Sequence, residues 1–176
     1  SSSSQNKFEY TKIKYAGNTE FNHSGSNFAH ALGVEGGKLS IMNTEISNSK
    51  SLGFFLHSGE INQFSENSFM DNQLYSIKVN ANEAGKLDNA TTFSNPEKAV
   101  EIYGSTLSST ADIVWPDLNG SARYYVSGWI NVDSYLEITD GAIFDFAEDK
   151  GITVRSSGVF VADATSSDQI VFTSKN

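Results

Sequence analysis

Apolar residues alternate with polar ones along most of the chain, in short runs separated by Gly, Asn and Ser. Pairs two residues apart recur, among them Ile152 with Val154 and Phe160 with Ala162. A period of two places one set of side chains on one face of a strand. Residues 80–89, the best helical candidate, are rich in Asn and lack an apolar stripe. The pattern therefore predicts short strands, with a loop at residues 80–89.

The short runs also repeat along the chain. Five rows align, and they are ALGVEGG from Ala31, GFFLHSG from Gly53, SIKVNAN from Ser76, AVEIYGS from Ala99 and GITVRSS from Gly151. Their starts are 22, 23, 23 and 52 residues apart, and the second and fourth positions of every row are apolar. A repeat of this length, built from short strands, is typical of a parallel β-solenoid in which each repeat forms one turn. We therefore expect an all-β solenoid of roughly seven turns with no substantial helix.

Three asparagines follow the apolar rows at a similar interval. Asn48, Asn72 and Asn95 are spaced 24 and 23 residues apart. Stacked amides at one bend would satisfy each other and the turn backbone, so the spacing predicts a structural asparagine ladder. The alternative is that Asn is simply a common turn residue.

Several stretches carry a family resemblance. They are YYVSGWINV (124–132), LEITDGAIFDF (136–146), GITVRSSGVFVADATSSDQIVFTS (151–174) and KFEYTKIKYAGN (7–18). Together they resemble secreted bacterial right-handed parallel β-helix repeat proteins of the pectate-lyase-like superfamily. Asp140 stands where that family has Pro, and Ala164 where it has Gly, so those turns are expected to differ locally. The resemblance implies a right-handed β-helix and a secreted or cell-surface location.

The order of these stretches suggests an organisation. The family places the stretch resembling residues 7–18 after the one resembling residues 151–174, whereas this chain has the reverse order. The expectation is a piece of a longer repeat array, with a flexible Ser-rich start at residues 1–7. Residues 8–120 would end one module, and residues 121–176 would begin the next, continuous with the first. Open strand edges at the two ends would favour end-to-end self-association.

Composition narrows the classes of function. Cysteine is absent from the 176 residues, which excludes disulfides, thiol catalysis and cysteine-bound metals. The formal net charge of −9 argues against nucleic acid as a partner. No apolar run approaches the roughly 20 residues of a membrane-spanning helix. The hydrophobic content of 38% is typical of a folded domain.

Catalytic chemistry has little support in the residue pattern. His30 and His57 occupy different columns of the repeat, so neither a metal-binding set nor a Ser/His/Asp triad is indicated. No single repeat column contains the candidate cations, which are Lys78, Lys86, Arg123, Lys150 and Arg155. The resemblance brings in polysaccharide lyases and hydrolases, but no catalytic motif matches and no catalytic residue or cofactor is assigned.

One acidic cluster suggests a metal. Asp145, Glu148 and Asp149 lie close together in sequence, and calcium prefers several oxygen ligands. Outward strand positions and polar turns explain the same residues without a metal. A calcium site at these three residues is therefore one of two interpretations.

A group of aromatic residues suggests a ligand. Trp115, Tyr124, Tyr125 and Trp129 lie near one another in sequence, and exposed rings on a strand face can stack on sugars. The alternative is that they fill the core or the junction between modules. The favoured function is a non-catalytic extracellular β-helix segment, a rigid structural or display module that binds carbohydrate or a surface partner. The alternative is a polysaccharide lyase or hydrolase whose active site lies on an outer face or on turns outside this chain.

Overall fold

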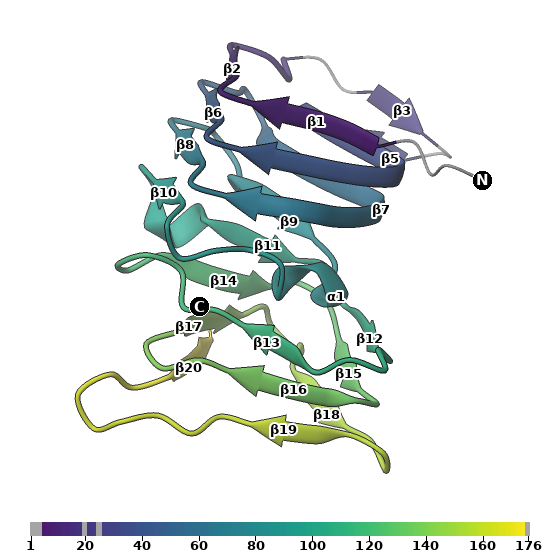
Figure 1. Ribbon diagram of the computed structural model, residues 1–176, viewed down its shortest axis with the longest axis vertical. Helices are drawn as coiled ribbons and strands as arrows, with labels where there is room; N and C mark the ends of the chain where they lie inside the picture. Colours follow the sequence, from purple (N-terminus) through teal and green to yellow (C-terminus); the bar gives the residue numbers. More distant parts are fainter. Residues whose placement is uncertain (1–4, 19–20, 24–25, 175–176) are drawn as a thin grey trace.

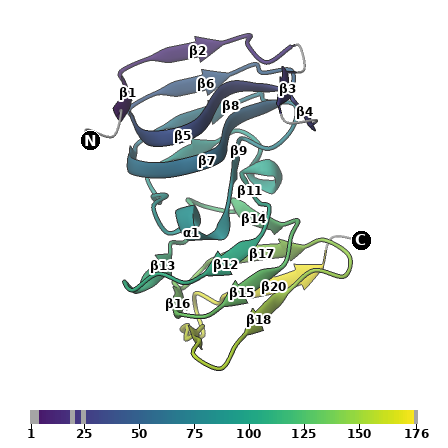
Figure 2. The same ribbon diagram turned by 90° about the vertical axis from the view of Figure 1, so that its right-hand side faces the viewer.

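The strands stack in parallel, turn upon turn, in a computed structural model that describes residues 5–18, 21–23 and 26–174 (Figures 1 and 2). Within these residues the only antiparallel strand pair is the hairpin of β3 (Phe21–His23) and β4 (Ser26–Phe28). Helix is limited to one turn of α1 (Ala81–Ala84) and the 3-10 helix η1 (Pro96–Lys98). The expected all-β solenoid without substantial helix is confirmed.

The largest sheet, called here the long sheet, has one strand from nearly every turn. Its order is β1 (Gln5–Glu9), β5 (His30–Met42), β7 (Leu52–Ser65), β9 (Ile77–Val79), β11 (Val100–Ile102), β14 (Arg123–Val126), β17 (Ile143–Phe146) and β20 (Val171–Ser174). The strands β5 and β7 are long enough to run around a corner of the solenoid (Figure 2). Their first halves continue the ladder of β9, whereas β1 pairs with the second half of β5.

Three smaller sheets form the other faces. In the upper half of Figure 1 the order is β2 (Lys12–Lys14), β6 (Glu45–Ser47), β8 (Ser68–Met70) and β10 (Thr92–Phe93). In the lower half one sheet has β12 (Ser105–Leu107), β15 (Ile130–Val132) and β18 (Ile152–Val154). The other has β13 (Ile113–Trp115), β16 (Tyr135–Ile138) and β19 (Val159–Val161).

Two local expectations change. The predicted flexible start at residues 1–7 is wrong for residues 5–7, which belong to β1 and pair with β5; residues 1–4 lie outside the described part. The predicted loop at residues 80–89 contains α1. The Asn80 side chain caps α1 by accepting a 2.9 Å hydrogen bond from the backbone N of Asn82, which explains why so polar a segment begins a helical turn.

The buried side of the long sheet is one continuous column, called here the inner column. It contains Phe54, Ile77, Val100, Tyr124, Phe144 and Phe172 in register.

The first four repeat rows are aligned as the sequence predicts, since Leu32 pairs with Phe54 and the ladder continues from there. The fifth row is wrong: its Ile152 pairs with Ile130 in a different sheet. The long sheet continues instead through Tyr124 and Phe144.

Aromatic rings fill the lower half of the core. The Phe144 ring stacks on Tyr124 at 5.0 Å and on Trp115 at 5.8 Å between ring centroids. Both polar ends are satisfied, since Trp115 Nε1 donates to the carbonyl of Ala81 and the Tyr124 hydroxyl donates to the carbonyl of Pro116. A buried indole or phenol with a hydrogen-bond partner avoids the cost of an unpaired donor.

Asn67 and Asn72 each join one turn to the turn before it through side-chain hydrogen bonds to the backbone. Only Asn72 belongs to the predicted ladder. The amide of Asn67 accepts from Thr44 N and donates to the Ile41 carbonyl, each at 3.1 Å. Asn72 makes the same pair of bonds one corner later, accepting from Ser49 N and donating to the Ile46 carbonyl.

The predicted ladder of Asn48, Asn72 and Asn95 is wrong in register. Ser47 pairs with Met70, so Asn48 is level with Asp71 and not with Asn72. The register of β8 with β10 makes Asn95 level with Asp71 as well. The similar spacing in sequence does not give the same register in space, because the turns differ in length. Asn72 is one position out of line with Asn48 and Asn95.

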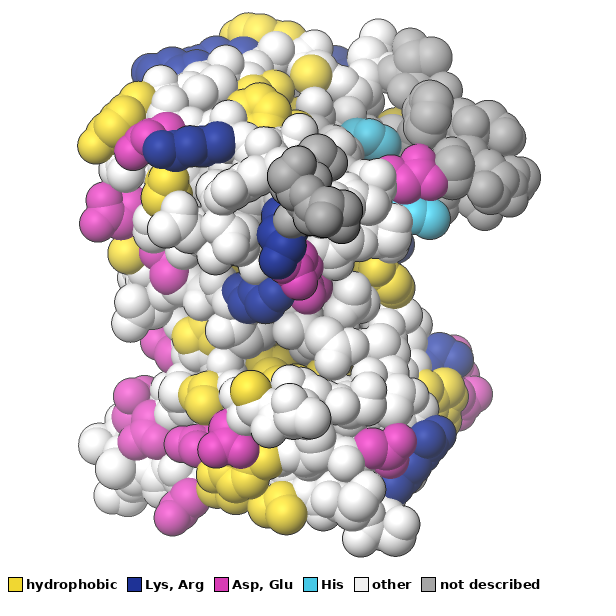
Figure 3. Space-filling model, turned by 45° about the vertical axis from the view of Figure 1, so that its right-hand side comes forward, with side chains coloured by type: hydrophobic (Ala, Val, Ile, Leu, Met, Phe, Trp, Pro, Cys, Tyr) yellow, Lys and Arg dark blue, Asp and Glu magenta, His cyan; other side chains and the backbone are white. Residues whose placement is uncertain are grey.

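The solenoid is interrupted in its fourth turn, which begins with β9. There α1 follows the second halves of β5 and β7 in place of a strand, and β10 is the last strand of its sheet, while β12 and β13 begin new sheets. Within the described residues the backbone ladder of the long sheet alone crosses from the upper to the lower half. Figure 3 shows the molecule narrower at this level than above or below it.

A pH-sensitive pair of salt bridges joins Lys12 and Lys14 of β2 to Glu45 of β6. Hydrogen bonds from Lys14, Lys12 and Ser47 to the Glu45 carboxylate lower its pKa from the ordinary 4.5 to about 2. Because the folded state lowers this pKa, the stabilisation is fully present above pH 4.5 and is lost as the pH falls through 2. An NMR titration of the Glu45 carboxyl should show a pKa near 2, and Lys14→Met should raise it. The exposed Lys50→Met variant should leave it unchanged; a wild-type value near 4.5 would contradict the contact.

Candidate functional site

The outer side of the long sheet carries a second continuous column, called here the outer column. It contains Phe55, Lys78, Glu101, Tyr125, Asp145 and Thr173 in register. The aligned rows contained this signal, because Phe55, Lys78 and Glu101 are the third residues of their rows, between the two apolar positions. In a strand the position between two buried residues points to the opposite face. Chemically diverse side chains therefore line one outer face.

Opposite charges pair along and beside the outer column. Lys78 Nζ lies 2.9 Å from Glu101 Oε1, and the Ser127 hydroxyl donates to the same oxygen at 2.7 Å. One strand further, Arg123 Nη1 lies 3.4 Å from both carboxylate oxygens of Asp145. Lys78 and Arg123 lie on the same sheet but in different columns, as expected, because the residue of β14 level with Lys78 is Tyr125. Each has a carboxylate partner, so the face carries both signs in balance.

Two tyrosines stack on this face. The rings of Tyr75 and Tyr125 are 5.2 Å apart between centroids and nearly parallel, with an interplanar angle of 3°. Burial raises the pKa of the Tyr75 phenol, and the nearby Tyr125, Glu101 and Asp145 raise it further. The phenol therefore stays protonated at neutral pH and can donate a hydrogen bond. Both rings are half-buried.

A second aromatic cluster surrounds Phe55 in the upper half. The imidazoles of His30 and His57 lie 6.0 and 5.6 Å from the Phe55 ring, and Tyr103 lies at 6.1 Å, all edge to face. Lys78 Nζ lies 5.8 Å from the same ring centroid. Burial lowers the pKa of His30, which favours its neutral form. The two histidines that occupy different repeat columns thus meet at one ring, as packing partners of Phe55.

The four aromatic candidates separate into two pairs. Trp115 and Tyr124 are fully buried in the core, so their prediction as carbohydrate-binding residues is wrong. Tyr125 lies on the outer column, and Trp129 is 53% exposed in the turn after β14. That turn packs closely on the turn before it, since a Cβ at Gly128 would clash with the carbonyl of Tyr103. The exposed Trp129 ring lies at the corner that follows β14, close to Gly151 of the next turn.

The three calcium candidates do not converge. Asp145 is nearly buried and pairs with Arg123, while Glu148 and Asp149 are exposed in the turn between β17 and β18. Over the described ranges, no group of three or more His, Asp or Glu side chains could hold a metal ion. The sequence placed the three residues near one another, but the strand β17 turns the first away from the other two.

A hollow lies beside the lower part of the outer column. It has a volume of about 250 Å³ and is lined by Glu97, Arg123, Asp145, Thr173 and Ser174. Arg123 Nε is buried there without a hydrogen-bond partner. Carboxylate, guanidinium and hydroxyl groups in one shallow hollow can both accept and donate hydrogen bonds, which suits a ligand rich in hydroxyl groups.

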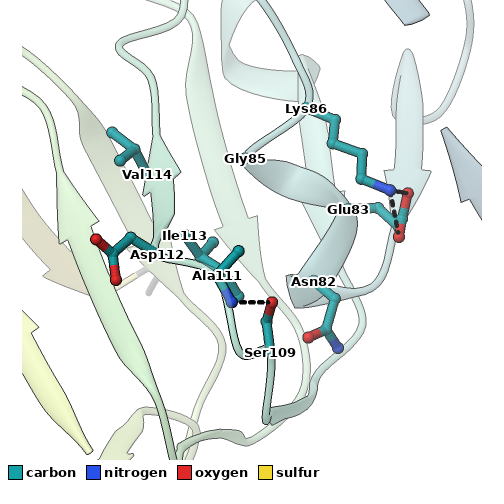
Figure 4. Close-up of a pocket in the computed structure, with 9 residues that line it drawn as sticks. All are labelled: Asn82, Glu83, Gly85, Lys86, Ser109, Ala111, Asp112, Ile113 and Val114. Atoms are coloured by element: carbon teal, nitrogen blue, oxygen red, sulfur yellow. Dashed lines mark hydrogen bonds and ion pairs between the residues drawn. The ribbon is translucent and has the colours of Figure 1, made fainter. Parts of the chain in front are cut away.

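A second hollow of about 330 Å³ lies between α1 and residues 109–114 (Figure 4). Its polar groups are mostly engaged within the protein. Lys86 pairs with Glu83, which also accepts a 2.6 Å bond from Ile61 N. The amide of Asn82 donates to Ser105 and Thr106. Figure 4 shows Asp112 pointing away from the Glu83–Lys86 pair. This hollow lies where α1 replaces a strand in the fourth turn, and its polar groups already have partners, so the outer column is the better candidate site.

Comparison with known proteins agrees with the fold. A family model described as the right handed beta helix region matches residues 1–112, more than half of the chain. No curated protein and no solved structure matches the chain significantly. Within the described ranges, no helix has the length and apolar character needed to cross a membrane.

Proposed function

Since the chain belongs to the right-handed β-helix family, we propose that it is a non-catalytic, secreted or cell-surface module that binds a polysaccharide along the outer column. The observation that carries this proposal is the uninterrupted register of aromatic, acidic and basic side chains on one outer face. The stacked Tyr75 and Tyr125 and the exposed Trp129 border the same face.

The geometry of the solenoid suits an extended ligand. Neighbouring strands are ~4.8 Å apart, so a chain lying along the axis meets one side chain of the outer column at each strand. Aromatic rings supply flat apolar surface, and the exposed Thr173 and half-buried Ser127 supply hydroxyl groups, whereas Glu101 and Asp145 are buried and hold the cations in place. A rigid backbone ladder holds these groups in place before binding, which reduces the entropy lost when a ligand binds.

The charges favour an uncharged polysaccharide. Lys78 and Arg123 already pair with Glu101 and Asp145, so the face offers no unpaired cation for an acidic sugar. The net charge of −9 adds repulsion toward polyanions. We therefore expect neutral glucans, xylans or mannans to bind in preference to pectate or alginate.

Isothermal titration with soluble neutral polysaccharides tests the proposal. Tyr125→Ala and Trp129→Ala should each weaken binding about tenfold, the equivalent of about 1.4 kcal/mol, because each removes one stacking ring. Tyr10→Ala is the matched control, since Tyr10 is 79% exposed but lies in the turn after β1. Equal loss in all three variants, or tighter binding to pectate than to neutral polymers, would contradict the proposal.

The enzymatic alternative rests on the same two carboxylates. Glu101 and Asp145 are two strand steps apart, so their backbones are about 9.6 Å apart, which is close to the carboxylate separation of about 6.5–9.5 Å in inverting glycosidases. Incubation with the same panel separates the two functions. New reducing ends, or absorbance from unsaturated products, that disappear in Glu101→Gln would favour the enzyme. Binding without product favours the module.

A further inference from the structure

The sequence contains a single Asn–Gly pair, Asn119–Gly120, in the turn between β13 and β14. Asn119, Gly120 and Ser121 are all exposed. Gly120 has a positive φ of 71°, which favours glycine, and a Cβ at this position would meet no atom within 4 Å. Solvent therefore has open access to the peptide bond between the two residues.

The polar groups of this pair are not engaged by the fold. Neither the Gly120 N–H nor the Asn119 side-chain amide makes a hydrogen bond to any described residue. The turn is closed by a long backbone bond, 3.4 Å from Ala122 N to the Asn119 carbonyl oxygen. Little therefore restrains the Asn119 side chain or the peptide that follows it.

A free backbone nitrogen after an asparagine can attack the asparagine side chain. The Gly120 nitrogen bonds to Cγ of Asn119 and gives up its proton. The bond from Cγ to Nδ2 breaks, ammonia leaves with that proton, and a cyclic imide remains. Water then opens the ring. Addition of water at the side-chain carbonyl gives aspartate, and addition at the backbone carbonyl gives isoaspartate. The reaction needs only solvent water.

Two other asparagines are followed by a small residue, in Asn48–Ser49 and Asn67–Ser68. In both pairs the serine N–H already donates a hydrogen bond. It donates to Asn72 Oδ1 at 3.0 Å in the first pair and to the Thr44 carbonyl at 2.9 Å in the second. A nitrogen held in this way cannot reach the side chain before it until the turn opens locally. The fold therefore protects these two asparagines.

The equivalent turn one level further, between β16 and β17, has the pair Asp140–Gly141. An Asp–Gly pair can form the same imide, but this one is covered. The Gly141 N–H donates to the Asp168 carbonyl at 3.3 Å, and a Cβ at Gly141 would lie 2.7 Å from the Asp168 side chain. Two turns at the same corner of the solenoid thus differ in whether the glycine nitrogen is free.

We propose that Asn119–Gly120 is a site of spontaneous deamidation, at which the folded protein slowly converts Asn119 into aspartate and isoaspartate. The observation that carries the proposal is the free, exposed glycine nitrogen in this turn, beside occupied nitrogens at the comparable pairs. The inference does not depend on whether the outer column binds a polysaccharide.

The product changes the turn in two ways. A carboxylate is ionised at neutral pH, so each conversion adds a negative charge two residues from Asp117. Oδ1 of Asp117 is buried and has no hydrogen-bond partner within the described part of the chain. Isoaspartate also lengthens the backbone by one atom between Leu118 and Ala122, which are both only 1% exposed. We therefore expect the modified turn to hold these two buried residues less firmly.

Incubation of the folded protein in mildly alkaline buffer tests the site, with ion exchange to separate acidic forms and peptide mapping by mass spectrometry to locate isoaspartate. Conversion at Asn119 should exceed that at Asn48 and Asn67 by at least about tenfold, the factor for each 1.4 kcal/mol needed to open a protected site. In urea this ratio should fall, because unfolding frees the serine N–H groups. An Asn119 that stays intact in the folded protein, or a ratio unchanged by urea, would overturn the proposal.

Two variants separate the chemistry from its consequences. Asn119→Gln is the matched control, because its longer side chain closes a larger ring much more slowly. It should form no new acidic species during the same incubation, and acidic forms appearing at the wild-type rate would overturn the assignment to Asn119. Asn119→Asp carries the charge without the added backbone atom. The isoaspartate form should unfold at lower urea than Asn119→Asp, and equal midpoints would contradict the effect on Leu118 and Ala122.

Discussion

Trp115→Ala is expected to lower the free energy of unfolding by about 3–5 kcal/mol. The indole is fully buried, stacks on Phe144 and donates a hydrogen bond to the Ala81 carbonyl. Removing it leaves a large cavity in the lower half of the core and leaves the Ala81 carbonyl, in α1, without the indole donor. Urea unfolding followed by circular dichroism gives the change, with the midpoint moving to lower denaturant.

Trp129→Ala is the matched control, because its indole is 53% exposed. Its stability should change by no more than about 0.5 kcal/mol. The two tryptophans therefore separate stability from the proposed binding: loss of Trp115 should destabilise the protein, and loss of Trp129 should weaken the proposed carbohydrate binding. Similar destabilisation by both substitutions would show that the turn after β14 contributes to the core.

Asn67→Ala is expected to cost about 2–4 kcal/mol, because it leaves two buried backbone groups without partners, each worth about 1–3 kcal/mol. These groups are the N–H of Thr44 and the carbonyl of Ile41. Asn67→Asp isolates half of the contact, since a carboxylate still accepts from Thr44 but cannot donate to Ile41. Urea unfolding should place Asn67→Asp below the wild type as well.

Asn95→Ala is the control for this pair. The Asn95 side chain makes no capping hydrogen bond to η1 and is only half-buried, so its loss should cost less than about 1 kcal/mol. Equal effects at positions 67 and 95 would contradict the assignment of the turn-bridging role to Asn67 and Asn72.

The inner column could be read from the sequence only while the turns kept one length. Leu32, Phe54, Ile77 and Val100 follow at intervals of 22 or 23 residues. The later members are 24, 20 and 28 residues apart, at Tyr124, Phe144 and Phe172. A fixed repeat could not follow these unequal loops, and it placed Ile152 in the wrong sheet.

The aromatic candidates show a second limit. Tyr124 and Tyr125 are neighbours in one strand, so one had to point inward and the other outward. Alternation alone predicts that division, but the strand's register decides which residue is buried. The ion pairs of Lys78 and Arg123 could not be predicted either, because they join residues 22 or 23 positions apart whose alignment depends on turn length.

The interruption at the fourth turn gives the solenoid an uneven bending stiffness. Elsewhere a bend must strain hydrogen-bonded strands on several faces, whereas here a single backbone ladder resists it, helped by the side-chain bonds of Trp115 and Asn82. The two halves can therefore rock about this strip at lower elastic cost than about any other level. A polysaccharide bound across Lys78 and Tyr125 would cross the level between β9 and β11 and contact both halves. Binding would therefore make the whole solenoid stiffer.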